Sequence, residues 1–335
     1  KRNLNFTIRQ YNYKSVAWNW SEELDRKLQK FDFVIIQTTA GAGFQNCAVL
    51  PSNVNVIVDG WVPLLAEMPV ALLGYHRIHR KFHWERFLPQ YHDLLTRANC
   101  VLYANDRQHY YYEGQFFSIN KIGWKAFKFS PLLKVPYGVD ITQQLDFSSR
   151  KEPGKLKLLW YGPVYPWYNP ELLIETFINH PNISIDFMGV KHPRYKKIYK
   201  SYFKKFFDKI EQCSNIKIIE DYQDTPEELF KQYDASILIA QNWLEEKYSH
   251  RARIFEILSH GMPIIINIGN AFMEEHPYLT NRGIFPVNSN NIKSELEKYI
   301  ALEPLFFSKE AFEQFQQQSK WKTVLKPLEE YIQNF

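Results

Sequence analysis

Short apolar runs alternate with amphipathic stretches of helical period along the second half of the chain. Each run is bounded by polar or turn residues, and the stretches between them repeat apolar side chains every three or four positions. Runs that are apolar on both faces are typical of parallel strands covered by helices on both sides. The predicted strands are KLKLLWYG at 155–162, ISIDFMG at 183–189, IKIIE at 216–220, ASILIA at 235–240 and PIIIN at 263–267. The pattern predicts a doubly wound α/β domain over residues 151–305.

The first 150 residues show the same alternation in a less regular form. Apolar runs occur at 31–37, 53–61, 100–105 and 132–140. We therefore expect a second Rossmann-like α/β domain over residues 1–150. The polar segment at 146–155 contains Pro153 and Gly154 and is predicted to link the two domains. From Ser308 the chain is expected to form helices, within 306–335, that cross back towards the first domain.

Composition limits the class of protein without defining its function. A chain of 335 residues with 45% hydrophobic content is long enough for two domains with separate cores. No apolar run reaches the roughly 18 residues of a membrane span, and no apolar signal core follows the basic N-terminus. We expect a cytoplasmic protein, with peripheral contact at the inner face of the membrane left open. The net charge of +5 suits an anionic small ligand, a membrane surface or nucleic acid equally well.

The segment EEKYSHRARIFEILSHGMPIII, at 245–266, carries the strongest chemical signal. Ser249 is expected at the start of a helix, with Arg253 and Glu256 on the same polar face of an otherwise apolar element. Free N–H groups at a helix start and an arginine are suited to a diphosphate, and Glu256 is suited to ribose hydroxyls. Glu246, before the helix, is placed to accept hydrogen bonds from a sugar. The alternative is a solvated ion pair between Arg253 and Glu256.

Loops that follow the strands supply further candidates, because ligands of open α/β sheets bind beyond the carboxyl ends of the strands. These loops are 162–169, 189–193, 242–249 and 269–272. Gly162, Trp167 and Asn169 are the candidate binding residues of the first loop. Arg251 adds a second guanidinium beside Arg253, but it falls on the apolar side of the helix, so a packing role is its alternative.

This arrangement resembles the nucleotide-sugar site of GT-B glycosyltransferases, especially the family 4-like group that acts on bacterial surface polysaccharides. The resemblance covers roughly residues 30–300 and is strongest in the second domain. LWYGPVYPWYNPELLIETF, from Leu159, is similar to the first βα unit of that domain. One position departs from the family pattern: Tyr248 stands eight residues before Glu256, where relatives carry a glutamate. The site residues that carry the resemblance are Glu246, Ser249, Arg251, Arg253 and Glu256, followed by GMPIII and GNAF.

The resemblance implies two Rossmann-like domains that face a cleft. A nucleoside-diphosphate-sugar would bind the second domain as donor substrate, with no cofactor, and a saccharide or lipid-linked saccharide acceptor would bind the first. It implies a hexosyl or deoxyhexosyl transferase of polysaccharide or glycan synthesis, with no nucleic-acid partner. Retention of configuration is implied, but the residues leave inversion open.

An inverting enzyme would need a base in the first domain. Asp59 is the first choice, followed by Glu67, His76 and His79, and Glu246 is a further catalytic candidate, in the second domain. Because no D-x-D tripeptide occurs, we expect no metal. Arg251, Arg253 and the helix dipole would then stabilise the leaving group.

Two basic segments have alternative interpretations. HRIHRKFHWERF, at 76–87, places His79 and His83 four residues apart, but it lacks HExxH order and nearby thiolates. A basic aromatic surface is therefore favoured over a zinc site. The segment 191–210 is a basic amphipathic helix with Phe203, Phe206 and Phe207 among lysines. Its aromatic side is either buried in the core or in contact with a membrane surface.

Two other functions remain open at this point. A sugar-nucleotide epimerase of the same architecture would turn over its substrate without an acceptor. A non-catalytic GT-B-like module of a larger synthase would bind carbohydrate or a partner chain without turnover. A dinucleotide-dependent oxidoreductase is disfavoured because no G-x-G-x-x-G sequence opens a βα unit.

Overall fold

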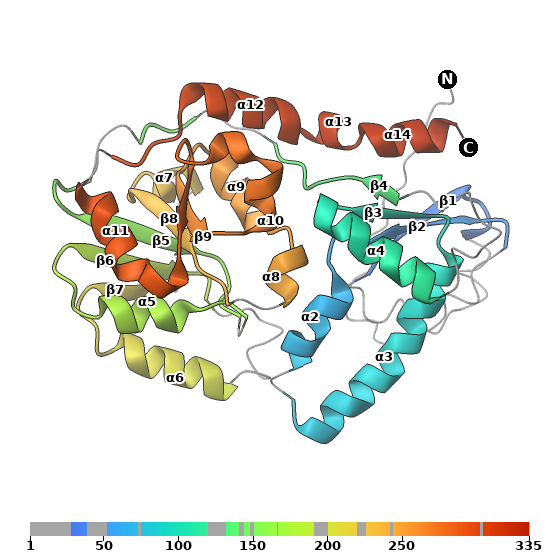
Figure 1. Ribbon diagram of the computed structural model, residues 1–335, viewed down its shortest axis with the longest axis horizontal. Coiled ribbons are helices and arrows are strands. Elements are labelled where there is room, and N and C mark those ends of the chain that lie inside the picture. Colours follow the sequence, from blue (N-terminus) through green and yellow to red (C-terminus); the bar gives the residue numbers. More distant parts are fainter. Residues whose placement is uncertain are drawn as a thin grey trace. The chain divides into compact units, whose positions relative to one another are not determined.

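The computed structural model contains two compact units, each with its own parallel sheet (Figure 1). The structure describes residues 28–38, 52–72, 75–119, 132–140, 144–147, 151–165, 167–190, 200–219, 226–241, 244–301 and 304–334. The first unit comprises residues 1–68, 75–136 and 325–335, and the second comprises 69–74 and 137–324. The second unit therefore begins before the predicted linker, and the end of the chain returns to the first unit.

The first unit is built on strands that pair in chain order. Their bounds are β1 Phe33–Gln37, β2 Asn55–Asp59, β3 Cys100–Tyr103 and β4 Leu132–Lys134. All of the pairs are parallel. The helices are α2 Leu64–Ala71, α3 Arg77–Arg97, α4 Asp106–Ser118 and, from the end of the chain, α14 Lys326–Gln333.

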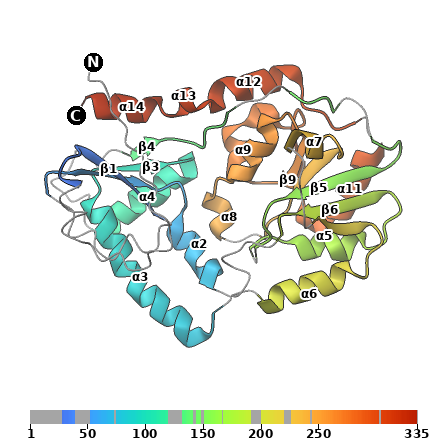
Figure 2. The ribbon, with the colours of Figure 1, turned by 180° about the vertical axis from the view of Figure 1, so that it is seen from behind.

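Helices cover both faces of this first sheet. Side chains alternate between the two faces along each strand, so one strand contributes to both cores. Val56 and Val58 pack with Tyr91 of α3 and Phe116 of α4 in one cluster. Ile57, Cys100 and Leu102 point to the other face and pack with Leu328 of α14. Figures 1 and 2 show α14 running beside β4.

The second unit has a sheet of order β10-β9-β8-β5-β6-β7, in which every pair is parallel. The strands are β5 Leu156–Tyr161, β6 Ile183–Met188, β7 Ile216–Ile219, β8 Ala235–Leu238, β9 Ile264–Asn267 and β10 Ile284–Val287. The order reverses between β5 and β8, which is the switch point where ligands of doubly wound sheets bind. The predicted α/β class with two Rossmann-like sheets is confirmed.

Helices pack on both sides of the second sheet (Figure 1). α5 Pro170–Phe177, α6 Lys200–Ile210 and α11 Ile292–Ala301 lie on one side. α7 Pro226–Phe230, α9 Ala252–Ser259 and α12 Lys309–Ser319 lie on the other. The remaining helices of the described residues are α8 Leu244–Tyr248, α10 Ala271–Glu275 and α13 Trp321–Val324, with short 3-10 turns at Pro277–Leu279 and Ser289–Asn291.

The aromatic side of α6 is part of this core. Phe206 is fully buried against Phe187, and Phe203 is 4% exposed, whereas Lys204 and Lys205 face solvent. Of the two interpretations of this basic segment, burial of the aromatic side is the one observed. Residues 191–199 lie outside the described residues.

Candidate active site

The candidate site lies at the carboxyl ends of β5 and β8, where the order of the second sheet reverses. The chain leaves β5 through Gly162, which has a φ of +99°. A Cβ at Gly162 would lie 3.2 Å from Cζ of Arg253, and a Cβ at Gly189, directly after β6, would lie 3.4 Å from Cα of Gly162. The missing side chain at Gly162 therefore makes the space in which the Arg253 guanidinium sits above the turn.

Arg253 is the cation of this site that keeps its charge unpaired. Its Nη2 donates a hydrogen bond to the carbonyl of Pro163 at 2.9 Å, and its Cζ lies 4.8 Å from the centre of the Tyr168 ring. Its Nη1 is buried and has no hydrogen-bond partner. Within the described ranges no carboxylate forms an ion pair with it. A buried donor on a positive group favours an anionic partner, because an unmet hydrogen bond of this kind is costly.

Arg251, two residues earlier, differs from Arg253 because carboxylates pair with its charge. It is 7% exposed, and its Nη2 lies 2.9 Å from Oε2 of Glu245. Its Nε donates to Oε2 of Glu246 at 3.1 Å, and its Cζ lies 4.4 Å from the centre of the Tyr168 ring. Two carboxylates thus neutralise Arg251, while Tyr168 stacks on both guanidinium groups.

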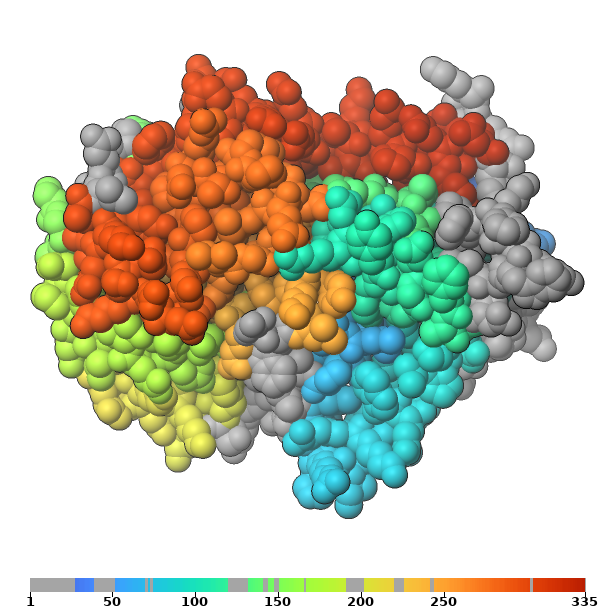
Figure 3. Space-filling view, viewed as in Figure 1, coloured from blue at the N-terminus to red at the C-terminus, as the bar shows by residue number. Residues whose placement is uncertain are grey.

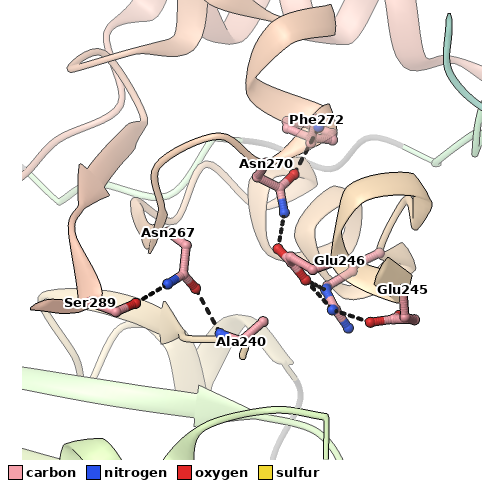
Figure 4. Close-up of polar contacts among 8 residues, drawn as sticks. Ala240, Glu245, Glu246, Asn267, Asn270, Phe272 and Ser289 are labelled. Atoms are coloured by element: carbon pink, nitrogen blue, oxygen red, sulfur yellow. Dashed lines mark hydrogen bonds and ion pairs between the residues drawn. The ribbon is translucent and has the colours of Figure 1, made fainter. Parts of the chain in front are cut away.

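Glu246 uses both of its carboxylate oxygens inside the second unit (Figure 4). Oε1 accepts a hydrogen bond of 2.6 Å from Nδ2 of Asn270, and Oε2 accepts from Arg251. Asn270 in turn caps α10 by accepting from the backbone N–H of Phe272 at 2.8 Å. Its neighbour Glu245 is buried, and this burial raises the pKa of Glu245 against the lowering effect of Arg251.

Asn267 joins three strand ends beside this network. Its Oδ1 accepts from the backbone N–H of Ala240 at 2.7 Å, and its Nδ2 donates to the hydroxyl of Ser289 (Figure 4). The loops after β8, β9 and β10 are thereby held together at the ligand edge. Asn270 lies in the loop predicted at 269–272, whereas Asn267 was not predicted as a site residue although it ends the strand predicted at 263–267.

The helix that carries Arg253 begins three residues later than the sequence predicts. Ser249 was expected at its start, but α9 begins at Ala252 with Arg251 as the N-cap. The predicted loop before it instead contains the short helix α8, and the N–H of Ser249 closes that helix on the carbonyl of Glu245 at 2.8 Å. Ser249 is buried. The extended backbone of Arg251, with φ −86° and ψ 112°, separates the two helices.

Glu256 lies one turn beyond Arg253 and is exposed. Its Oε1 accepts a hydrogen bond of 2.9 Å from the hydroxyl of Tyr161, at the end of β5. Burial, together with the negative charge of Glu256, raises the pKa of Tyr137 nearby. His260, four residues after Glu256, contacts Glu227 of α7 at 3.2 Å. The helix therefore presents Arg253 and Glu256 on the side of β5.

The loop after β5 provides an aromatic wall. Trp167 is 4% exposed and stacks on Tyr165, with ring centres 4.4 Å apart and planes 8° apart. Asn169 caps α5 by accepting from the N–H of Leu172 at 3.4 Å. Tyr168, between them, was missed as a candidate although it contacts both arginines. Residues 191–193 and 242–243 of the other predicted loops lie outside the described residues.

The base candidates of the first unit lie in and beside its sheet. Asp59 ends β2, and its Oδ1 accepts a hydrogen bond of 3.3 Å from the N–H of Trp61. Glu67 lies in the first turn of α2 and is half-buried. His76 caps α3, and His79 is exposed on that helix. Among the residues that the structure describes, no group of three His, Cys, Asp or Glu side chains is placed to hold a metal ion.

Asp59→Asn is expected to stabilise the protein at neutral pH. Burial raises the pKa of Asp59, and the N–H of Trp61 opposes this only in part. The folded-state pKa of Asp59 lies above its unfolded-state pKa. The contribution of the protonated Asp59 carboxyl to stability is therefore full at acid pH and is lost as the pH rises through the folded-state pKa. Asparagine retains an acceptor for Trp61 and cannot ionise.

Thermal unfolding of both proteins over a pH series measures this effect. The Tm of the variant should exceed that of the parent at pH 7, and the two values should converge at acid pH. A lower Tm for the variant at pH 7 would show that the ionised carboxylate stabilises the fold.

Comparison with known proteins identifies the fold. No family model matches the sequence, and no curated protein matches it. Among solved structures, sucrose-phosphate synthase from Thermosynechococcus elongatus aligns with a TM-score of 0.65 at 12% identity, over 99% of this chain and 81% of that one. Anabaena HepE in complex with UDP-glucose aligns with a TM-score of 0.62 at 14% identity, over 94% and 82%. The pneumococcal O-GlcNAc transferase GtfA, in complex with UDP and GlcNAc, aligns with a TM-score of 0.53 at 12% identity, over 93% and 59%. The chain has the GT-B fold of these glycosyltransferases.

Proposed function

We propose that the protein is a glycosyltransferase that moves a sugar from a nucleoside-diphosphate-sugar to a saccharide acceptor. The observation that carries this proposal is the Arg253 guanidinium. It is positive, unpaired by carboxylates of the described residues and partly buried at the switch point of a doubly wound sheet. A diphosphate offers the paired oxygens that such a guanidinium binds best. HepE and GtfA were solved with UDP or UDP-glucose, which makes uridine nucleotides the first donors to test.

The residues around Arg253 have roles consistent with this donor. Arg253 and the N–H groups at the start of α9 would bind the diphosphate and stabilise its charge as the sugar leaves. Glu256 keeps Oε2 for the ribose hydroxyls while Tyr161 holds Oε1. Arg251, Glu245 and Glu246 would position Arg253 through Tyr168. Trp167 and Tyr165 would form the wall of the site.

We propose a metal-independent transfer of a hexosyl or deoxyhexosyl group with retention, in the synthesis of a polysaccharide or other glycan. In the inverting alternative Asp59 is the base, because its raised pKa makes a carboxyl more basic. A lipid-linked acceptor would place the protein at a membrane surface. No helix within the described residues is long and apolar enough to cross a membrane.

Arg253→Ala is expected to weaken nucleoside-diphosphate binding by about 10-fold to 100-fold, as expected when a charge-assisted hydrogen bond is lost. Isothermal titration calorimetry with UDP, GDP and dTDP on both proteins measures this. Arg282→Ala removes an equal charge from the exposed surface of the same unit and should leave the affinity unchanged. Arg253→Lys retains the positive charge but not the paired N–H donors of the guanidinium, so its affinity should lie between that of Arg253→Ala and that of the parent.

The proposed site is wrong if no nucleoside diphosphate binds, or if Arg253→Ala binds as tightly as the parent. Product analysis with the donor that binds then identifies the reaction. Transfer that depends on an added saccharide supports a transferase. A changed sugar on the nucleotide without any acceptor would indicate an epimerase, and binding without turnover would indicate a non-catalytic module.

A further inference from the structure

The first half of α3 is a surface of the first unit that the core does not use. In its second half, Tyr91, Leu94 and Leu95 are fully buried in that unit. From residue 77 to residue 86, by contrast, every side chain except Arg80 and Trp84 is exposed. Figure 3 shows this helix, in cyan, on the outer surface. The composition of the exposed half therefore needs a reason other than packing within the unit.

Two apolar side chains lie at the centre of the exposed face. Ile78 is 72% exposed and Phe82 is 57% exposed. Because they are four residues apart, they lie one above the other on the same side of the helix. At 100° per residue this side is opposite the one that carries Tyr91 and Leu95 into the core. The helix thus has a second apolar face that no described residue covers.

Basic side chains outnumber acidic ones in this exposed stretch. Arg77, Lys81 and Arg86 are exposed and Glu85 is the single acidic residue, whereas Arg80 is half-buried on the opposite side of the helix, where its Nε donates to the carbonyl of Tyr75 at 2.7 Å. Lys81 and Glu85 form an exposed ion pair of 3.6 Å, which is weak in water. Arg77 and Arg86 are exposed and pair with no carboxylate of the described residues. The face therefore combines exposed hydrophobic area with an excess of positive charge.

We propose that the first half of α3 binds the surface of a membrane that contains anionic lipids. Ile78 and Phe82 enter the boundary between headgroups and acyl chains, and Arg77, Lys81 and Arg86 contact lipid phosphates. Nucleic acid fits less well, because its phosphate backbone offers nothing to the two apolar side chains. A second copy of the chain fits less well, because two equally basic faces repel each other. α6 offers exposed charged side chains without an exposed aromatic one, since Phe203 and Phe206 are buried.

This inference names the surface for the membrane location proposed above, and it rests on the exposed half of α3 rather than on transferase activity. Its test is vesicle flotation in the absence of nucleotide and acceptor. The parent protein should float with vesicles of phosphatidylcholine containing about one third phosphatidylglycerol at low salt, and less at high salt. Ile78→Ser/Phe82→Ser and Arg77→Gln/Arg86→Gln should each reduce partitioning about tenfold.

Matched variants separate this surface from general effects. Ile268→Ser removes a 61% exposed apolar side chain from the second unit, and Lys204→Gln/Lys205→Gln removes two exposed charges from α6. Both should float like the parent. The proposal is overturned if the parent does not float, if Ile78→Ser/Phe82→Ser floats as well as the parent, or if the α6 variant loses as much binding as the α3 variants. None of these results bears on nucleotide binding, which is measured separately, so failure of this inference can be told apart from failure of the proposed function.

Discussion

Arg251→Ala should be the most destabilising single substitution in the candidate site, with an expected loss of at least about 3 kcal/mol in the free energy of unfolding. The guanidinium lies between Glu245 and Glu246 and is 7% exposed. Its removal leaves two acidic groups without their cation, one of them buried, and exposes the face of Tyr168 on which it stacks. For a unit of this size, the Tm should fall by about 6–12 °C. Differential scanning calorimetry measures the change.

The effect of the two unpaired acidic groups can be separated from the effect of shortening the Arg251 side chain. Glu245→Gln/Glu246→Gln in the Arg251→Ala background removes the orphaned charges and should recover part of the lost stability. Without Arg251, burial raises the folded-state pKa of Glu245 further, so the destabilisation by Arg251→Ala should grow as the pH rises. Arg282→Ala, on the exposed surface, should change the Tm by less than about 2 °C. A loss that is equal at all pH values and unaffected by the glutamine changes would contradict this account.

The sheet of the second unit was predictable because its strands are apolar on both faces and short. The run predicted at 183–189 is β6 at Ile183–Met188, and the run at 263–267 contains β9 at Ile264–Asn267. Helix boundaries were less predictable, as the region around Ser249 illustrates. The sequence EEKYSHRARIF forms two helices, because residues 249–251, with the extended backbone of Arg251, lie outside both. The ion pairs of Arg251 with Glu245 and Glu246 accompany that conformation, and Tyr168, from the distant loop after β5, packs on the same guanidinium.

The polar network of the site was less predictable than the helix that carries it. Tyr168 lies 83 residues before Arg251 in the chain, yet it stacks on Arg251 and on Arg253. Asn270 meets Glu246 across a separation of 24 residues. Such contacts follow from the order of the strands, because β5, β8 and β9 are neighbours in the sheet. Residue type and spacing predicted Arg253 and Glu256, whereas their supports required the three-dimensional arrangement.

Gly162→Ala should reproduce the binding defect of Arg253→Ala without changing any charge. Gly162 has a φ of +99°, a conformation that side chains rarely adopt, and a Cβ there would lie 3.2 Å from Cζ of Arg253. The methyl group would move the guanidinium off the turn and break its hydrogen bond to Pro163. We expect nucleoside-diphosphate affinity to fall by about 10-fold to 100-fold, measured by the same calorimetry. Gly154→Ala also places a Cβ at positive φ, +71°, but in open space, and should leave the affinity unchanged.

The double variant decides whether Gly162 acts through Arg253. If the glycine serves only to place the guanidinium, Gly162→Ala should cost nothing further in the Arg253→Ala background, so the two losses would not add. If the losses add, the turn itself contacts the ligand through its backbone, and Arg253 is one of two independent anchors. Strain at the positive φ should lower the Tm of Gly162→Ala and Gly154→Ala alike, so the difference between their affinities isolates the contact with Arg253. The non-additive result would establish that the absent side chain at Gly162, directly after β5, sets the position of the charge on α9.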